Sequence, residues 1–111
     1  HVRPLWLSTH YPLPIGEHTI GRYDHERPST ISIKGDSSMS RRSISITASI
    51  SKDEGFRYLL RVLSATNPVS HAGHMLAEGE EIYLNFGYEL RLGGTLFRFV
   101  PDDKAPRFGS F

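Results

Sequence analysis

The stretch from Ser43 to Ser51 has the sequence SISITASIS. Its apolar residues alternate with serine and threonine, which is the two-residue period of a β-strand with one buried and one polar face. A second apolar run, Phe56 to Leu63, follows after Lys52 to Gly55 (KDEG), a segment typical of a hairpin loop. We therefore predict a β-hairpin whose first strand turns these side chains toward the core: Ile44, Ile46, Ala48 and Ile50.

The rest of the chain repeats this strand pattern in shorter pieces. Tyr88 to Leu92 and Thr95 to Val100 flank Gly93-Gly94, a pair suited to a tight primed turn. No stretch keeps a helical period over three turns, so the predicted class is all-β, an antiparallel sandwich or barrel. Further predicted strands are Leu5 to Ser8, Glu17 to Gly21, Ile31 to Ile33 and Glu81 to Leu84, and Trp6, Phe56, Phe97 and Phe99 are expected in the core.

Length and composition indicate one domain spanning residues 1–111. Pro12 and Pro14 predict a loop after the first strand, and residues 101–111 are expected to be a linker or a loosely held tail. The chain starts at His1 instead of methionine, so we expect it to be excised from a longer protein. A net charge of +1 argues against a general nucleic-acid binder, which needs a clear cationic excess.

The chain has no cysteine, which excludes disulfides and thiolate metal sites and fits a reducing, cytoplasmic location. No apolar run approaches the roughly 20 residues of a membrane-spanning helix, so no membrane insertion is expected. His71 and His74 have no evident third ligand and, three residues apart, are expected to point to opposite faces, so no metal site is predicted. No nucleophile elbow appears, and we predict neither enzymatic activity nor a cofactor.

Five polar side chains follow predicted strands and could converge on one phosphate group. Arg22 offers a planar guanidinium fork, and Ser40 and Thr66 offer hydroxyl donors. Arg41 offers a backbone N–H and a second positive charge. Asn67 carries both a donor and an acceptor and can pair with the main chain of an extended peptide.

Five segments together resemble the forkhead-associated (FHA) domain over about Ile15 to Val100, the core of the chain. The resemblance implies an FHA/SMAD-like β-sandwich of about eleven short strands that binds phosphothreonine peptides through loops at one end. It implies that Arg22, Ser40, Arg41 and Thr66 hold the phosphate and that Asn67 holds the peptide main chain. The matching segments are Thr19 to Arg22 (TIGR), Ser37 to Arg42 (SSMSRR), Leu63 to Asn67, Gly73 and Phe86 to Gly93.

The chain departs from the family pattern at three supporting positions. A histidine three residues after the loop serine is Ser43 here, a glycine after the asparagine is Pro68, and a second asparagine is Ala72. Three functions therefore stay open. The leading prediction is a signalling module that binds a phosphothreonine-containing protein or peptide. The alternatives are a phospho-independent interaction or assembly module with a degenerate pocket, and a β-domain of an enzyme whose chemistry lies elsewhere.

Overall fold

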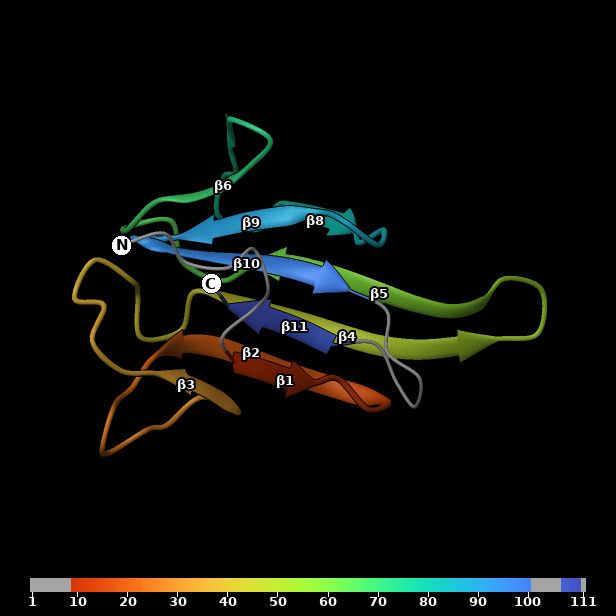
Figure 1. Ribbon diagram of the computed structural model, residues 1–111, viewed down its shortest axis with the longest axis horizontal. Helices are drawn as coiled ribbons and strands as arrows, with labels where there is room; N and C mark the ends of the chain where they lie inside the picture. Colours follow the sequence, from red (N-terminus) through yellow and green to blue (C-terminus); the bar gives the residue numbers. More distant parts are fainter. Residues whose placement is uncertain (1–8, 101–106, 111) are drawn as a thin grey trace.

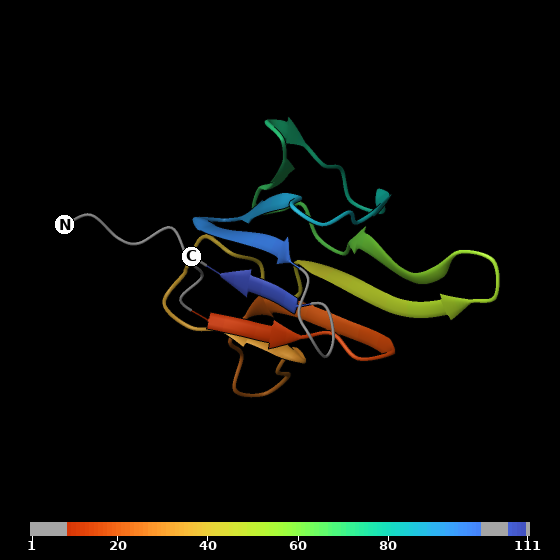
Figure 2. The ribbon, with the colours of Figure 1, turned by 45° about the vertical axis from the view of Figure 1, so that its right-hand side comes forward.

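The computed structural model describes residues 9–100 and 107–110, and within these ranges the chain forms eleven strands and no helix. Two sheets lie face to face (Figure 1, Figure 2), which confirms the predicted all-β sandwich. The strands are β1 (Thr9–Pro12), β2 (Gly16–Arg22), β3 (Ile31–Ile33), β4 (Ile44–Ser51), β5 (Gly55–Val62), β6 (Val69–His71), β7 (His74–Met75), β8 (Glu81–Tyr83), β9 (Glu89–Leu92), β10 (Thr95–Val100) and β11 (Arg107–Ser110).

One sheet has the strand order β1-β11-β10-β9-β6-β7, and the other has the order β3-β2-β4-β5-β8. Neighbouring strands are antiparallel except for β2 and β3, which run parallel with Arg22 opposite Ile33. Within the described residues, no helix is long and apolar enough to cross a membrane.

The core lies between the two sheets and draws on both faces. β4 contributes Ile44, Ile46 and Ala48, as predicted, and all three are buried. Phe97 and Phe99 on β10 are also buried, and the ring of Phe99 lies 4.9 Å from that of Tyr58 on β5. Because each buried large apolar side chain stabilises the fold by about 1.5–3 kcal/mol, this layer holds the sheets together.

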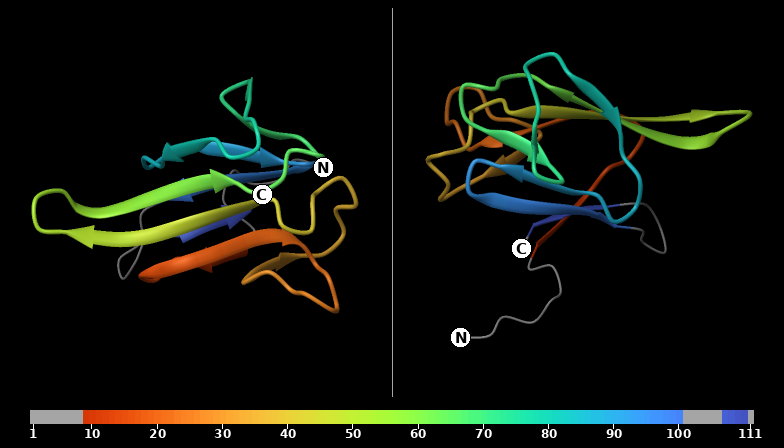
Figure 3. Two further views of the ribbon diagram at one scale, coloured as in Figure 1. Left: turned by 180° about the vertical axis from the view of Figure 1, so that it is seen from behind. Right: turned by 90° about the horizontal axis from the view of Figure 1, so that it is seen from above.

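The far end of the β4–β5 hairpin departs from the prediction. Ile50 is 63% exposed and Phe56 is 59% exposed, so their assignment to the core is wrong. The pairing of β2 with β4 ends at Gly16, opposite Ala48, so the later residues of β4 have no partner on β2. The pairing of β8 with β5 begins only at Leu59, so the earlier residues of β5 have no partner on β8. The hairpin therefore extends past both neighbours (Figure 1; Figure 3, right), and no opposite sheet covers its tip.

The first and last strands, β1 and β11, pair with each other. β11 lies between β1 and β10, with Phe108 opposite both Tyr11 and Phe99. The expected loose tail is therefore wrong for residues 107–110. Pro12 closes β1 instead of lying in a loop, which an edge strand tolerates because it has a free side. The predicted strand Leu5 to Ser8 and the core assignment of Trp6 lie outside the described residues.

A tight hairpin joins β6 and β7. His71 and His74 are direct cross-strand partners, so the expectation that they point to opposite faces is wrong. A two-residue turn places residues i and i+3 opposite each other on the same face. Ala72 and Gly73 form that turn, both with positive φ, at 51° and 82°. Among the described residues, no three metal-ligating side chains gather at one place.

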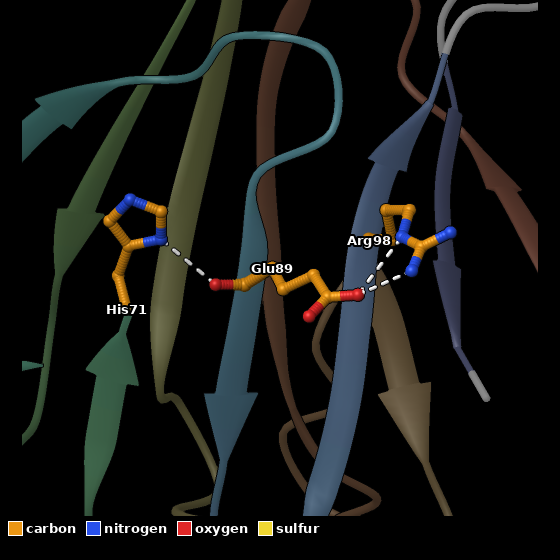
Figure 4. A network of polar contacts seen from close by, with 3 residues as sticks. All are labelled: His71, Glu89 and Arg98. Atoms are coloured by element: carbon orange, nitrogen blue, oxygen red, sulfur yellow. Dashed lines mark hydrogen bonds and ion pairs between the residues drawn. The ribbon is translucent and has the colours of Figure 1, made fainter. Parts of the chain in front are cut away.

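Polar contacts fix this hairpin to the sheet (Figure 4). His71 Nδ1 lies 2.9 Å from the carbonyl oxygen of Glu89, and its ring lies 4.4 Å from that of Tyr88. Arg98 on β10 donates through Nε and Nη2 to Glu89 Oε2, at 3.0 and 2.5 Å. The contacts connect β6, β9 and β10 within the six-stranded sheet.

Two isoleucines on one strand give a matched test of the core. Ile46 is fully buried, so Ile46→Asp would bury an unpaired carboxylate and should destabilise the domain by more than about 4 kcal/mol. Ile50→Asp should change the free energy of unfolding by less than about 1 kcal/mol. Circular dichroism and thermal melting of both variants measure the difference, and a native-like melt of Ile46→Asp would contradict this core assignment.

The β6–β7 turn should accept a stabilising substitution. Ala72 has a left-handed backbone, which Asn tolerates better than Ala because its short polar side chain bonds locally. We expect Ala72→Asn to raise the free energy of unfolding by about 0.5–1 kcal/mol. Ala72→Val, which is β-branched, should lower it. Urea denaturation measures both changes, and a destabilised Asn variant would speak against this turn geometry.

Candidate phosphate-binding site

Three loops meet at one end of the sandwich because of how β2 pairs. β3 runs parallel to β2 and ends beside Arg22, so the β3–β4 loop, residues 34–43, begins at that point. β4 begins opposite Ile20 and β5 ends opposite Ile44, so the β5–β6 loop, residues 63–68, starts at the same end. The β2–β3 loop, residues 23–30, also leaves from there (Figure 1, left).

These loops surround a cleft of about 760 Å³. All five residues predicted from the sequence line it: Arg22, Ser40, Arg41, Thr66 and Asn67. The structure thus brings together side chains that are up to 45 positions apart in the sequence, while their roles stay predictions. Sequence reasoning gave no site role to four further charged side chains that also line the cleft: Glu17, Asp24, Arg27 and Arg42.

Arg22 lies at the end of β2 and is half-buried. Its Nε donates to the carbonyl oxygen of Met39 at 3.2 Å, and its backbone N–H donates to the carbonyl of Ser40 at 2.9 Å. The ion pairs among the described residues belong to Arg57, Arg61 and Arg98, so no described carboxylate neutralises Arg22. Its guanidinium is oriented by one carbonyl, and no described residue accepts a hydrogen bond from its terminal N–H groups.

Gly21 lets the β3–β4 loop lie directly on β2. A Cβ atom at this position would come within 1.9 Å of the carbonyl oxygen of Arg41 and within 2.9 Å of that of Ser40. Both neighbours are backbone atoms, so a side chain cannot be accommodated without moving the loop. Ser29 Oγ donates to the same Arg41 carbonyl at 3.0 Å and so ties the β2–β3 loop to the β3–β4 loop.

Ser40 and Asn67 connect two of the loops. Ser40 is buried, and its Oγ accepts a long hydrogen bond from Nδ2 of Asn67, at 3.4 Å. Because Ser40 Oγ is the acceptor in this contact, its own O–H can still donate into the cleft. Thr66 and Arg41 are exposed at the cleft surface, where their side chains can reach a bound group.

The main chain of Ser43 connects the strands at the position where the FHA resemblance implies a histidine. Ser43 is buried, and its backbone N–H donates to the carbonyl of Ile20 at 3.0 Å. Its carbonyl accepts from the N–H groups of Leu63 and Ser64, at 2.9 and 3.3 Å. These bonds tie the end of the β3–β4 loop to the start of the β5–β6 loop without a long side chain.

Asp36 braces the β3–β4 loop against the β9–β10 turn. Its Oδ1 accepts from the backbone N–H and hydroxyl of Ser38, and its Oδ2 accepts from the N–H of Gly94 at 2.9 Å and from Thr95 Oγ1. Gly93 packs against the same loop, since a Cβ there would lie 2.4 Å from the Ser38 carbonyl oxygen. The sequence predicts Asp36 as a turn residue, but it does not predict the hydrogen bond from Gly94, which is 58 positions away.

The hydrogen bonds also set the ionisation of Asp36. Burial of this carboxyl would raise its pKa, but the bonds from Ser38, Thr95 and Gly94 outweigh burial and hold the pKa below its ordinary value of 3.8. The carboxylate form therefore stabilises the folded state. This contribution is complete above the unfolded pKa and is lost as the pH falls through the lower, folded pKa.

We expect Asp36→Asn to destabilise the domain at neutral pH, because an amide cannot accept all four hydrogen bonds. The stability difference between wild type and variant should shrink as the pH falls below about 4, because Asp36 then binds a proton in the unfolded state before it does so in the folded state. Urea denaturation of both proteins between about pH 2.5 and pH 7 measures the difference in their free energies of unfolding. A difference that stays constant across this range would show that the charge of Asp36 has no part in stability.

The sequence matches no protein-family model and no curated protein, but the fold is similar to solved FHA domains. One comes from a structural and functional analysis of phosphothreonine-dependent FHA domain interactions, with a TM-score of 0.58 and 22% identity, covering 90% of this chain and 80% of that chain. The FHA domain of MEK1 has a TM-score of 0.57 and 17% identity, and the match covers 88% of this chain and 74% of that chain. The FHA-2 domain of an ABC transporter from Mycobacterium tuberculosis has a TM-score of 0.53 and 20% identity, and the match covers 96% of this chain and 83% of that chain. The chain therefore has an FHA-like fold, as the sequence motifs predicted.

Proposed function

We propose that this domain is an interaction module, not an enzyme, and that it binds a phosphothreonine-containing protein or peptide in a cytoplasmic signalling role. The observation that carries the proposal is the cleft in which Arg22, oriented by a carbonyl and paired with no described carboxylate, lies with Ser40, Arg41 and Thr66. The similar FHA structure from work on phosphothreonine-dependent interactions supports the choice of ligand.

Recognition would use fixed donors and no chemical step. Phosphothreonine carries about −1.5 to −2 charges at neutral pH and three acceptor oxygens. The Arg22 guanidinium can bond two of these oxygens, and the hydroxyls of Ser40 and Thr66 can donate to the phosphate from the two facing loops. Arg41 adds charge at the cleft surface. Asn67, whose Nδ2 faces Ser40, would bond the peptide main chain beside the phosphate.

The alternative is a phospho-independent interaction module, favoured by the changes at Ser43, Pro68 and Ala72. In a decayed pocket, Arg22 would be expected to pair with an internal carboxylate. Among the described residues it does not, and the loops keep supports through the main chain of Ser43 and the side chain of Asp36. These contacts favour the phosphate-binding function over the alternative.

Arg22→Ala should weaken binding of a phosphothreonine peptide by tenfold or more, since a charge-assisted hydrogen bond contributes about 1.5–3 kcal/mol. The peptide is selected from a degenerate phosphothreonine library, and isothermal titration calorimetry gives the affinities. Arg91→Ala is the matched control, because Arg91 is exposed on β9 and does not line this cleft.

Two results would overturn the proposal. Equal affinity of wild type and Arg22→Ala for the phosphopeptide would remove the phosphate role of Arg22. Capture of a partner that phosphatase treatment leaves undiminished would favour the phospho-independent module instead.

A further inference from the structure

The cleft carries more positive charge than one phosphothreonine needs. Four arginines line it: Arg22, Arg27, Arg41 and Arg42. None of them forms an ion pair with any described residue, whereas Arg57, Arg61 and Arg98 are each paired with a glutamate. Unpaired cations gathered in one cleft favour anionic ligands and repel one another when the cleft is empty.

The two carboxylates that line the cleft do not cancel this charge where the phosphate would lie. Glu17 is five residues from Arg22 on β2, which is about 16 Å of strand, and it borders a separate hollow with Arg61 and Glu81. Asp24 is close in sequence to Arg22, but its Oδ1 accepts from the backbone N–H of Glu26 at 3.2 Å. The four arginines and Asp24 that line this part of the cleft carry a net charge of +3 (four minus one), against about −1.5 to −2 for a phosphothreonine.

Arg27 lies on the flank of the cleft formed by the β2–β3 loop. Two anchors hold this loop near its end: Ser29 Oγ donates to the Arg41 carbonyl at 3.0 Å, and the N–H of Thr30 donates to Thr19 Oγ1 at 3.0 Å. Arg27 is two residues from the first anchor, which joins its loop to the main chain of Arg41, and Arg27, Arg41 and Arg42 all line the cleft. Asn67, expected to hold the peptide main chain, belongs to the β5–β6 loop instead.

On the basis of the proposed function, we propose that Arg27 and Arg42 bind a second anionic group of the same partner, next to the phosphothreonine. That group is a flanking carboxylate side chain or a second phosphorylated residue. The cleft volume of about 760 Å³ is in the range that encloses a drug-sized ligand, so it has room for more than one phosphate group. The surplus charge is then matched by the ligand.

The test compares three phosphothreonine peptides whose flanking residues are alanine, aspartate or a second phosphothreonine, placed on either side in turn. Calorimetry measures the affinity of each peptide for wild type, for the double variant Arg27→Ala/Arg42→Ala and for the control Arg91→Ala. We expect wild type and the control to bind the aspartate or doubly phosphorylated peptide about fivefold to tenfold more tightly than the alanine peptide, on one side only. The double variant should lose this preference and keep its affinity for the alanine peptide. The stronger of the two anionic peptides identifies the source of the charge.

The outcomes separate this inference from the proposed function. If the alanine peptide binds in an Arg22-dependent manner but wild type shows no preference for an anionic flank, the second site is overturned and the phosphate site stands. If the double variant keeps the preference, Arg27 and Arg42 do not carry it. If wild type binds none of the phosphopeptides, both proposals fail together.

Discussion

The arrangement of the loops at the cleft end of this domain depends on the close approach between Gly21 and the carbonyl oxygens of Ser40 and Arg41. Only hydrogen at the Cα of Gly21 lets the β3–β4 loop rest on β2, and from this contact follow the main-chain bond between Arg22 and Ser40 and the orientation of Arg22 by Met39. A charged side chain and a hydroxyl from separate segments are thereby held together before any ligand arrives. Such preorganisation reduces the entropy lost on binding.

The loops have supports that do not involve a histidine at position 43. The main chain of Ser43 joins β2 to the β5–β6 loop, and Asp36 ties the β3–β4 loop to the β9–β10 turn. Neither contact needs the imidazole that the FHA resemblance implies at position 43. The absence of one expected side chain therefore says little about a pocket until the main-chain bonds around it are known.

The sequence predicted the features that local patterns determine. Alternation in β4 identified the buried face at Ile44 and Ile46. The loop motifs predicted roles for Arg22 and Ser40, and both residues line the cleft. Alternation cannot show where the opposite sheet stops, so Ile50 and Phe56 were assigned to the core although they lie beyond it. The position of Arg27 depends on the contact between Ser29 and Arg41, twelve residues apart, and no local pattern reports such a contact.

β11 also has a consequence for how the domain folds. Its residues 107–110 pair with residues 9–12 on one side and 97–100 on the other, so the six-stranded sheet joins segments about 100 positions apart. Closing so large a loop is entropically unfavourable, and sandwiches rich in distant pairings fold slowly. Until β11 arrives, β10 presents an open edge next to Phe97 and Phe99, a surface on which other chains can add strands. The time during which the chain is prone to self-association therefore ends when the four residues of β11 pair with β10.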